Sequence, residues 1–151
     1  MSSLGNMIHD VVLTPLARMG SEQGTVSRML RATDPVFRRF GEIYFSSVPP
    51  HIVKDWRLHR SLTMNLAVPL GTVRFVLFDD RDGSATRGTT SEYVLGDDNY
   101  QLLTIPNGIW TSFGNLSNTP ALVANCASEP HDPAEIVRRT LDDPPVPNAW
   151  R

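Results

Sequence analysis

The segment DWRLHRSLTMN, residues 55–65, places an arginine and a histidine where they could act on a carbonyl compound. In an extended strand successive side chains alternate between two faces, so Arg57 and His59 share one face. An unperturbed imidazole titrates near neutrality, which suits removal of a proton made acidic by an adjacent carbonyl. We therefore predict that His59 is a general base and that Arg57 or Asn65 holds the substrate oxygen that becomes negatively charged. The alternative is that His59 is a surface histidine or one bonded for structural reasons.

Four further side chains are candidates for binding a small molecule. Asn65 and Asn125 each offer an amide that can hydrogen-bond a ligand carbonyl or hydroxyl, or else satisfy a backbone group at the end of a barrel. Tyr44 and Trp110 offer flat faces for a nucleotide base or a sugar. Aromatic residues in strands are also common core residues, and the sequence leaves both alternatives open.

The elements that must position these residues are predicted to be strands. From Glu42 onward, short runs rich in β-branched and aromatic residues alternate with proline, glycine and aspartate, and eight such runs can be counted: GEIYFSSV, HIVKDWRLH, TMNLAVPLG, TVRFVLFD, SEYVLG, YQLLTI, IWTSFG and ALVANC. No long helical pattern separates them. This spacing predicts an all-β fold, in which antiparallel sheets close into a single jelly-roll barrel domain over residues 1–151.

Short peripheral helices are predicted at two places outside these strands. Thr33-Asp34-Pro35 supplies a helix cap and a first-turn proline, which predicts a helical turn that ends at Gly41. Asp132-Pro133-Ala134-Glu135 has the same features with a capping-box glutamate, which predicts a helix through about Leu141. The proline-rich tail that follows is predicted to be extended, with Trp150 packed against the barrel or a partner subunit.

The Pro106-Asn107-Gly108 sequence predicts a sharp turn between two strands. The register after this turn places Thr111 on the same face as Ile109 and Phe113, and Trp110 on the other face.

Composition excludes several classes of partner. The 151 residues carry a net charge of -2, and the 14 basic residues are scattered, so the sequence predicts no nucleic-acid or membrane partner. Cys126 is the only cysteine and cannot form an intrachain disulfide. The N-terminal residues lack the pattern of a signal peptide and the apolar runs are short, so we expect a cytoplasmic protein.

Common catalytic motifs are absent from the sequence. It has no glycine-rich phosphate loop, Gly-x-Ser-x-Gly elbow, His-Glu-x-x-His or Cys-x-x-Cys. Cys126 lies in an apolar run without a basic neighbour, so it is not predicted to be a nucleophile. The acidic cluster at residues 79–84 lacks the order of a calcium loop and is predicted to be a hairpin turn.

The order of the later motifs resembles the second motif of the cupins. That motif's glycine, proline, glycine and asparagine occur in order at Gly96, Pro106, Gly108 and Asn115. Thr111 stands where the motif has its histidine, and Arg57-Leu58-His59 stands where the first motif has His-x-His. With one metal ligand left, we predict no bound metal and no other cofactor, and we count Thr111 among the substrate-binding residues.

Within the cupins the chain is most similar to the dTDP-4-dehydrorhamnose 3,5-epimerase family, from about Phe40 to Trp150. The resemblance implies a metal-free jelly roll, usually dimeric, that binds a nucleotide-linked 4-keto-6-deoxy sugar. It also implies that His59 removes the proton next to the keto group, since the family's catalytic histidine falls at this position.

Three catalytic positions depart from the family. Its lysine falls near Met64 or Asn65, its tyrosine near Ala124 or Asn125, and its aspartate beyond Trp150. The first hypothesis is therefore an epimerase or isomerase of a nucleotide-linked keto sugar. The second is a cupin that binds a carbohydrate or small metabolite without converting it, and the third is a metal-dependent cupin enzyme.

Overall fold

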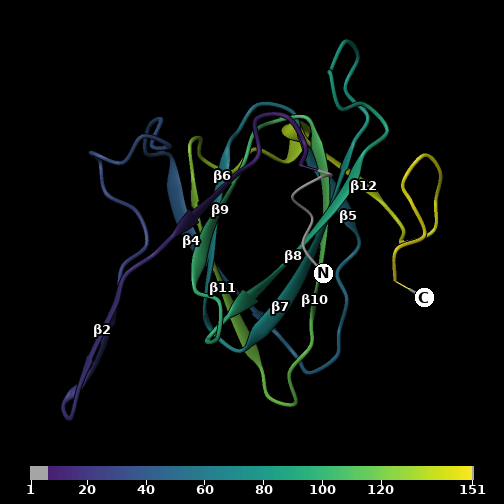
Figure 1. Ribbon diagram of the computed structural model, residues 1–151. Helices are drawn as coiled ribbons and strands as arrows, with labels where there is room; N and C mark the ends of the chain where they lie inside the picture. Colours follow the sequence, from purple (N-terminus) through teal and green to yellow (C-terminus); the bar gives the residue numbers. More distant parts are fainter. Residues whose placement is uncertain (1–6, 151) are drawn as a thin grey trace.

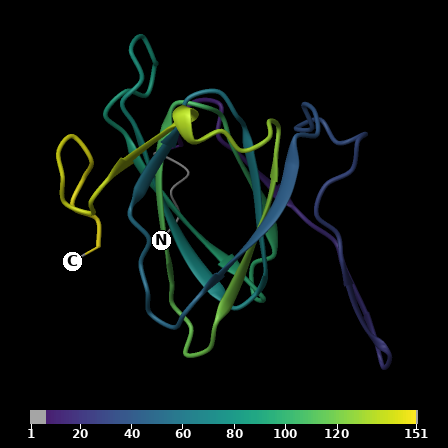
Figure 2. The same ribbon diagram turned by 180° about the vertical axis from the view of Figure 1, so that it is seen from behind.

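The protein forms two antiparallel sheets that face each other, as seen in a computed structural model that describes residues 7–150 (Figures 1 and 2). The strands of the first sheet, in spatial order, are β1 (Val12–Pro15), β9 (Gln101–Ile105), β6 (Met64–Leu70), β11 (Ala121–Ala127) and β4 (Glu42–Val48). Those of the second are β12 (Ile136–Arg139), β5 (Trp56–His59), β10 (Ile109–Asn115), β7 (Thr72–Asp79) and β8 (Thr90–Gly96). The predicted jelly-roll barrel is confirmed.

All eight strands predicted from residue 42 onward are present, as β4 to β11. Their alternating patterns place one set of side chains between the sheets, where Phe75, Leu77 and Leu103 are fully buried. No helix of the described residues is long and apolar enough to cross a membrane.

The chain before β4 contains strands rather than the predicted helical turn. β2 (Arg18–Ser21) and β3 (Gly24–Ser27) form a separate hairpin that projects from the barrel (Figure 1). Residues 33–36 form turns and a bend, and residues 37–41 have no regular secondary structure, so the expected helical turn is wrong. The Asp34 carboxylate, expected near the start of that helical turn, instead accepts a hydrogen bond from the backbone N–H of Arg31 at 2.8 Å.

The predicted C-terminal helix is also wrong beyond its first turn. Asp132 caps it as expected, because its side chain accepts from the backbone N–H of Ala134, but the helix is a 3-10 turn that covers only Pro133–Glu135. The chain then becomes β12, in which Ile136 lies opposite His59. The β-branched residues at the start of β12 favour this pairing at the edge of the second sheet over a continued helix.

Two sharp turns occur at the predicted glycines. Gly71, between β6 and β7, has a φ of 90°, and a Cβ there would lie 2.7 Å from the Cβ of Ala121. Gly108 has a φ of 89° and completes the turn that takes the chain from β9 in one sheet to β10 in the other. Its N–H donates to the backbone oxygen of His59 at 2.7 Å, so this turn also holds the backbone of β5.

The tail after β12 covers the outer face of the second sheet. Val146 packs with Trp56 and Trp110, and the indole N–H of Trp56 donates to the backbone oxygen of Leu141. The Arg74 guanidinium lies 4.6 Å from the centre of the Trp150 ring. Of the two positions expected for Trp150, the barrel surface is therefore the one observed.

Candidate active site

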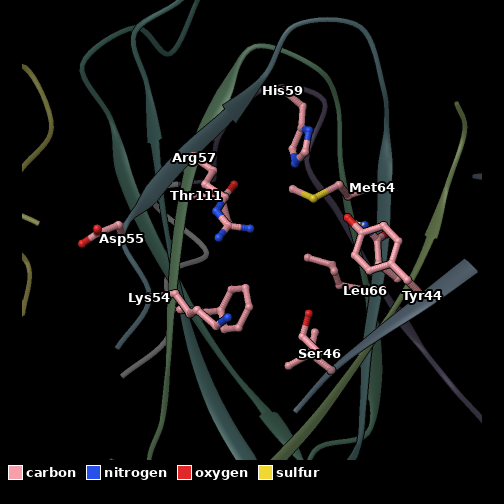
Figure 3. Close-up of a pocket in the computed structure, with 12 residues that line it drawn as sticks. Tyr44, Ser46, Lys54, Asp55, Arg57, His59, Met64, Leu66 and Thr111 are labelled. Atoms are coloured by element: carbon pink, nitrogen blue, oxygen red, sulfur yellow. Dashed lines mark hydrogen bonds between the residues drawn. The ribbon is translucent and has the colours of Figure 1, made fainter. Parts of the chain in front are cut away.

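A pocket of about 540 Å³, including its open mouth, lies between the two sheets. Five of the predicted site residues line it, namely Tyr44, Arg57, His59, Thr111 and Asn125. His59 and Arg57 come from β5, and Tyr44 faces them across the pocket from β4 in the opposite sheet (Figure 3). Met64 and Leu66 of β6, with Phe113 of β10, give the pocket its apolar surface.

His59 is buried and bound to a carboxylate. Its Nδ1 lies 2.5 Å from Oε1 of Glu135, and the side chain is 7% exposed. When Nδ1 carries the proton and donates to Glu135, Nε2 keeps a lone pair. Within residues 7–150 Nε2 has no hydrogen-bond partner, and the ring projects into the pocket (Figure 3). This arrangement can accept a proton from a molecule in the pocket.

Glu135 is held in place by the segment that follows β5. Its Oε2 accepts from the backbone N–H and the hydroxyl of Ser61, and its own backbone oxygen accepts from the N–H of Arg60. Burial by itself would raise the pKa of Glu135, but the hydrogen bonds from His59 and Ser61 outweigh burial and lower that pKa. Glu135 is therefore a carboxylate near neutral pH and fixes the orientation of the imidazole.

Two groups beside His59 could bind a ligand oxygen. Arg57 and Thr111 lie opposite each other on the neighbouring strands β5 and β10. The Thr111 hydroxyl is buried and has no hydrogen-bond partner among the described residues. The Arg57 guanidinium points into the pocket (Figure 3). A ligand carbonyl in the pocket can accept hydrogen bonds from both groups, and the buried Thr111 hydroxyl is costly to leave unpaired away from water.

Tyr44 and Asn125 form a hydrogen-bonded pair on the side of the pocket that the first sheet provides. They lie in register on β4 and β11, and the Asn125 amide donates to the Tyr44 hydroxyl at 2.8 Å. The Asn125 amide oxygen accepts from the backbone N–H of Asn65. Asn125 thus lines the pocket and also satisfies a backbone group, so both of its predicted roles are compatible with its position.

The structure places the other two predicted binding residues outside the pocket. Asn65 alternates with Met64 and Leu66, which line the pocket, so its side chain faces the other way and bonds to Thr104 and to the backbone oxygen of Cys126. Trp110 belongs to the apolar cluster under the C-terminal tail, with Arg139 against its ring. Neither residue lines this pocket, because each is on the face of its strand that points away from it, so the pocket gives no support to their predicted contact with substrate.

Asp79 and Cys126 are titratable groups that lie outside the pocket lining. Among residues 7–150 no group of three or more His, Cys, Asp and Glu side chains could hold a metal ion. The acidic segment after β7 is a turn, as predicted, in which Asp79 binds Arg81. Burial raises the pKa of the Cys126 thiol, which leaves it un-ionised near neutral pH.

Two residues of the site are not predicted from the sequence: one is bound to His59 and the other lines the pocket. Glu135 has the spacing of a capping box, and only the pairing of β12 with β5 brings it to His59, 76 residues away. Lys54 also lines the pocket, and the available signal was that it is the only lysine in the sequence.

Comparisons with known proteins agree with this fold. The chain is 43% identical to a dTDP sugar isomerase from Desulfovibrio desulfuricans G20, covering 95% of this chain and 92% of that one, with a TM-score of 0.92. It is 26% identical to the spore coat polysaccharide biosynthesis protein SpsL of Bacillus subtilis (strain 168), over 95% of this chain and 97% of that protein.

A more distant structure shares the fold. A dTDP-6-deoxy-D-glucose-3,5-epimerase from Legionella pneumophila Philadelphia 1, solved with dTDP-4-keto-L-rhamnose, has a TM-score of 0.78 at 23% identity, covering 91% of this chain and 76% of that one. No family model matches the sequence. The identity to the first structure, spread over nearly the whole of both chains, shows that this chain belongs to the cupin-type family of dTDP-sugar isomerases and epimerases.

Proposed function

We propose that this protein is an epimerase or isomerase of a nucleotide-linked 4-keto-6-deoxy sugar, with His59 as the proton-abstracting base. The observation that carries the proposal is the imidazole of His59, held by Glu135 through Nδ1 and open to the pocket at Nε2. The family membership and the keto sugar bound by the Legionella enzyme support this class of substrate. The expected cytoplasmic location stays a prediction.

The first step is removal of a proton from the carbon next to the keto group. The electron pair of the C–H bond forms the enolate, whose negative oxygen accepts hydrogen bonds from Arg57 and Thr111. The proton goes to Nε2 of His59, and the carboxylate of Glu135 stabilises the resulting imidazolium. None of these residues needs a metal or cofactor to perform this step.

The side from which the proton returns decides the product. The Tyr44 hydroxyl faces the pocket from the sheet opposite His59, so a proton delivered from there inverts the carbon and gives an epimer (Figure 3). A proton returned by His59 comes back on the original face, either to the same carbon or to the former keto carbon. The second route requires that the deprotonated carbon bears a hydroxyl group, whose proton moves to the former keto oxygen while the first carbon becomes the new ketone. Its product is an isomer with a shifted keto group.

Exchange of the substrate's α-proton with solvent tests the proposal directly. We expect the protein to exchange this proton for deuterium when it is incubated in D₂O with dTDP-linked 4-keto-6-deoxy sugars, as followed by proton NMR. The position of the label and the stereochemistry of the product identify the epimer or the isomer.

A non-catalytic binding protein is the competing function, and one pocket residue favours it. Met64 lines the pocket near the place where the family's lysine is expected, and it supplies no positive charge. If this function is correct, the sugar nucleotides raise the melting temperature of the protein while no proton exchanges. That outcome would contradict the enzymatic proposal.

We also propose that the protein is a homodimer, as the family resemblance implies. Ile43 and Phe45 of the edge strand β4 and Leu70 of β6 are 53%, 63% and 56% exposed on the outer face of the first sheet, which supports an interface there. Light scattering is expected to give about twice the chain mass of 16.8 kDa. Phe45→Glu is expected to give the monomer mass, and Val26→Glu, on the projecting hairpin, serves as the control.

A further inference from the structure

Lys54 is fixed at the end of the pocket away from His59. Its backbone N–H donates to the oxygen of Phe113 at 2.8 Å, and its own backbone oxygen accepts from the hydroxyl of Ser112 at 2.6 Å. These bonds tie the residue to β10 just before β5 begins. The side chain is half-buried and turns into the pocket (Figure 3).

The ammonium group of Lys54 has no counter-ion in the part of the chain that the structure describes. Asp55, the acidic residue nearest in sequence, also lines the pocket, but its carboxylate points away from the Lys54 ammonium (Figure 3). A cation that is partly removed from water without an anionic partner is unfavourable, and a bound anion relieves that cost. The pocket therefore has an anion-binding end, and its ligand should carry the negative charge.

The positions of His59, Arg57 and Lys54 along the second sheet indicate which part of a ligand would carry the anion bound by Lys54. Arg57 and Thr111 lie next to His59, whereas Lys54 bonds to Phe113, two residues or roughly 7 Å beyond Thr111 along β10 and further from His59. When the acidic carbon of the sugar is at His59, the keto oxygen is within reach of Arg57 and Thr111. Lys54 then meets the part of the ligand beyond the ring, which in a nucleotide-linked sugar is the phosphate on the anomeric carbon.

We infer that Lys54 binds the phosphate next to the sugar, so that the substrate lies with its keto end at His59 and its diphosphate end at Lys54. The inference rests on the proposed function, and it assigns to Lys54 a role in substrate affinity and orientation. It also distinguishes Lys54 from a group that stabilises the enolate.

Chemical labelling can test the contact between Lys54 and the phosphate without turnover, because Lys54 is the only lysine in the sequence. We expect an amine-reactive reagent to modify Lys54 at least tenfold more slowly in saturating dTDP than in buffer, as measured by peptide mass spectrometry. Thymidine, which has no phosphate, should leave the rate unchanged. The N-terminal amine in the same sample reports the intrinsic rate. Equal protection by thymidine, or none by dTDP when calorimetry shows that dTDP is bound, would overturn the inference.

Substitutions separate affinity from chemistry. Lys54→Met is expected to raise the Kd for dTDP roughly tenfold to a hundredfold and to raise KM more than it lowers kcat. Lys54→Arg should restore most of the affinity, and Arg28→Met, which removes a charge far from the pocket, should keep the wild-type Kd. If Lys54→Met keeps the dTDP affinity and loses α-proton exchange at saturation, Lys54 acts on the enolate instead.

These outcomes are independent of the proposed reaction. The dTDP measurements require no turnover, so a wild-type protein that exchanges no proton rejects the enzymatic function, whereas loss of dTDP protection rejects the role of Lys54.

Discussion

His59→Asn is expected to slow exchange of the substrate's α-proton by about 10²–10⁴-fold, because it removes the base that receives the proton. Asparagine is close in size to histidine and can still bond to Glu135, so the buried side chain is replaced without an unpaired carboxylate. The exchange rate in D₂O, followed by proton NMR at saturating substrate, is the measurement. Retention of exchange within tenfold of the wild-type rate would show that another group takes the proton.

Two matched variants identify the source of this loss. His51→Asn changes an exposed histidine that bonds to Asn118, and it should exchange at the wild-type rate. Glu135→Gln keeps a hydrogen-bond acceptor near Nδ1 but removes the negative charge that stabilises the imidazolium. Its exchange rate should fall between those of the wild type and His59→Asn. A double variant no slower than His59→Asn would show that Glu135 acts through His59.

The largest effect on stability is expected from Asp79→Asn, at the end of β7. Asp79 is completely buried and accepts hydrogen bonds from Arg81 at 2.9 Å, Ser84 at 2.6 Å and Thr86 at 2.7 Å. Removing one partner of a buried ion pair costs about 3–5 kcal/mol, because the other charge is left without compensation. Urea denaturation monitored by tryptophan fluorescence measures this loss in the free energy of unfolding.

The same carboxylate predicts sensitivity to acid. Burial tends to raise the pKa of Asp79, but the bonds from Arg81, Ser84 and Thr86 together lower it well below the ordinary value of 3.8. The unfolded chain therefore binds a proton more readily than the folded one. The stabilisation is fully present above the unfolded pKa and is lost progressively as the pH falls below about 4.

A nearby carboxylate provides the control for both measurements. Asp82 lies in the same loop, with a side chain 95% exposed, and pairs with Arg87. Asp82→Asn should change the free energy of unfolding by at most about 1 kcal/mol, as is usual for exposed ion pairs. Equal effects of the two substitutions would mean that Asp79 gains nothing from its buried position.

The sequence predicts the barrel well because its strands follow local rules. Alternation of side chains determines that Thr111 faces the pocket and Trp110 does not, and the register after Gly108 shows this. The aromatic side chain of Trp110 suggests a binding residue, but alternation places it on the face of β10 that points away from the pocket. Asn65 is likewise outside the pocket lining, since it alternates with Met64 and Leu66 of the pocket wall.

The contacts that complete the site could not be predicted in this way. The pairing of β12 with β5 joins segments about 80 residues apart, and the capping sequence around Asp132 gives a stronger local signal for a helix than for a strand. Lys54 precedes β5, where the chain is extended but outside the regular strand, so alternation does not determine which way its side chain points.

The position of Glu135 links catalysis to local opening of the fold. It lies just before β12, which pairs with a single neighbour at the sheet edge, and edge elements can open at a lower free energy than the barrel as a whole. A molecule in which β12 has opened keeps the pocket but has a histidine without its carboxylate. The amide hydrogen exchange of β12 would therefore report the fraction of molecules whose base is assembled.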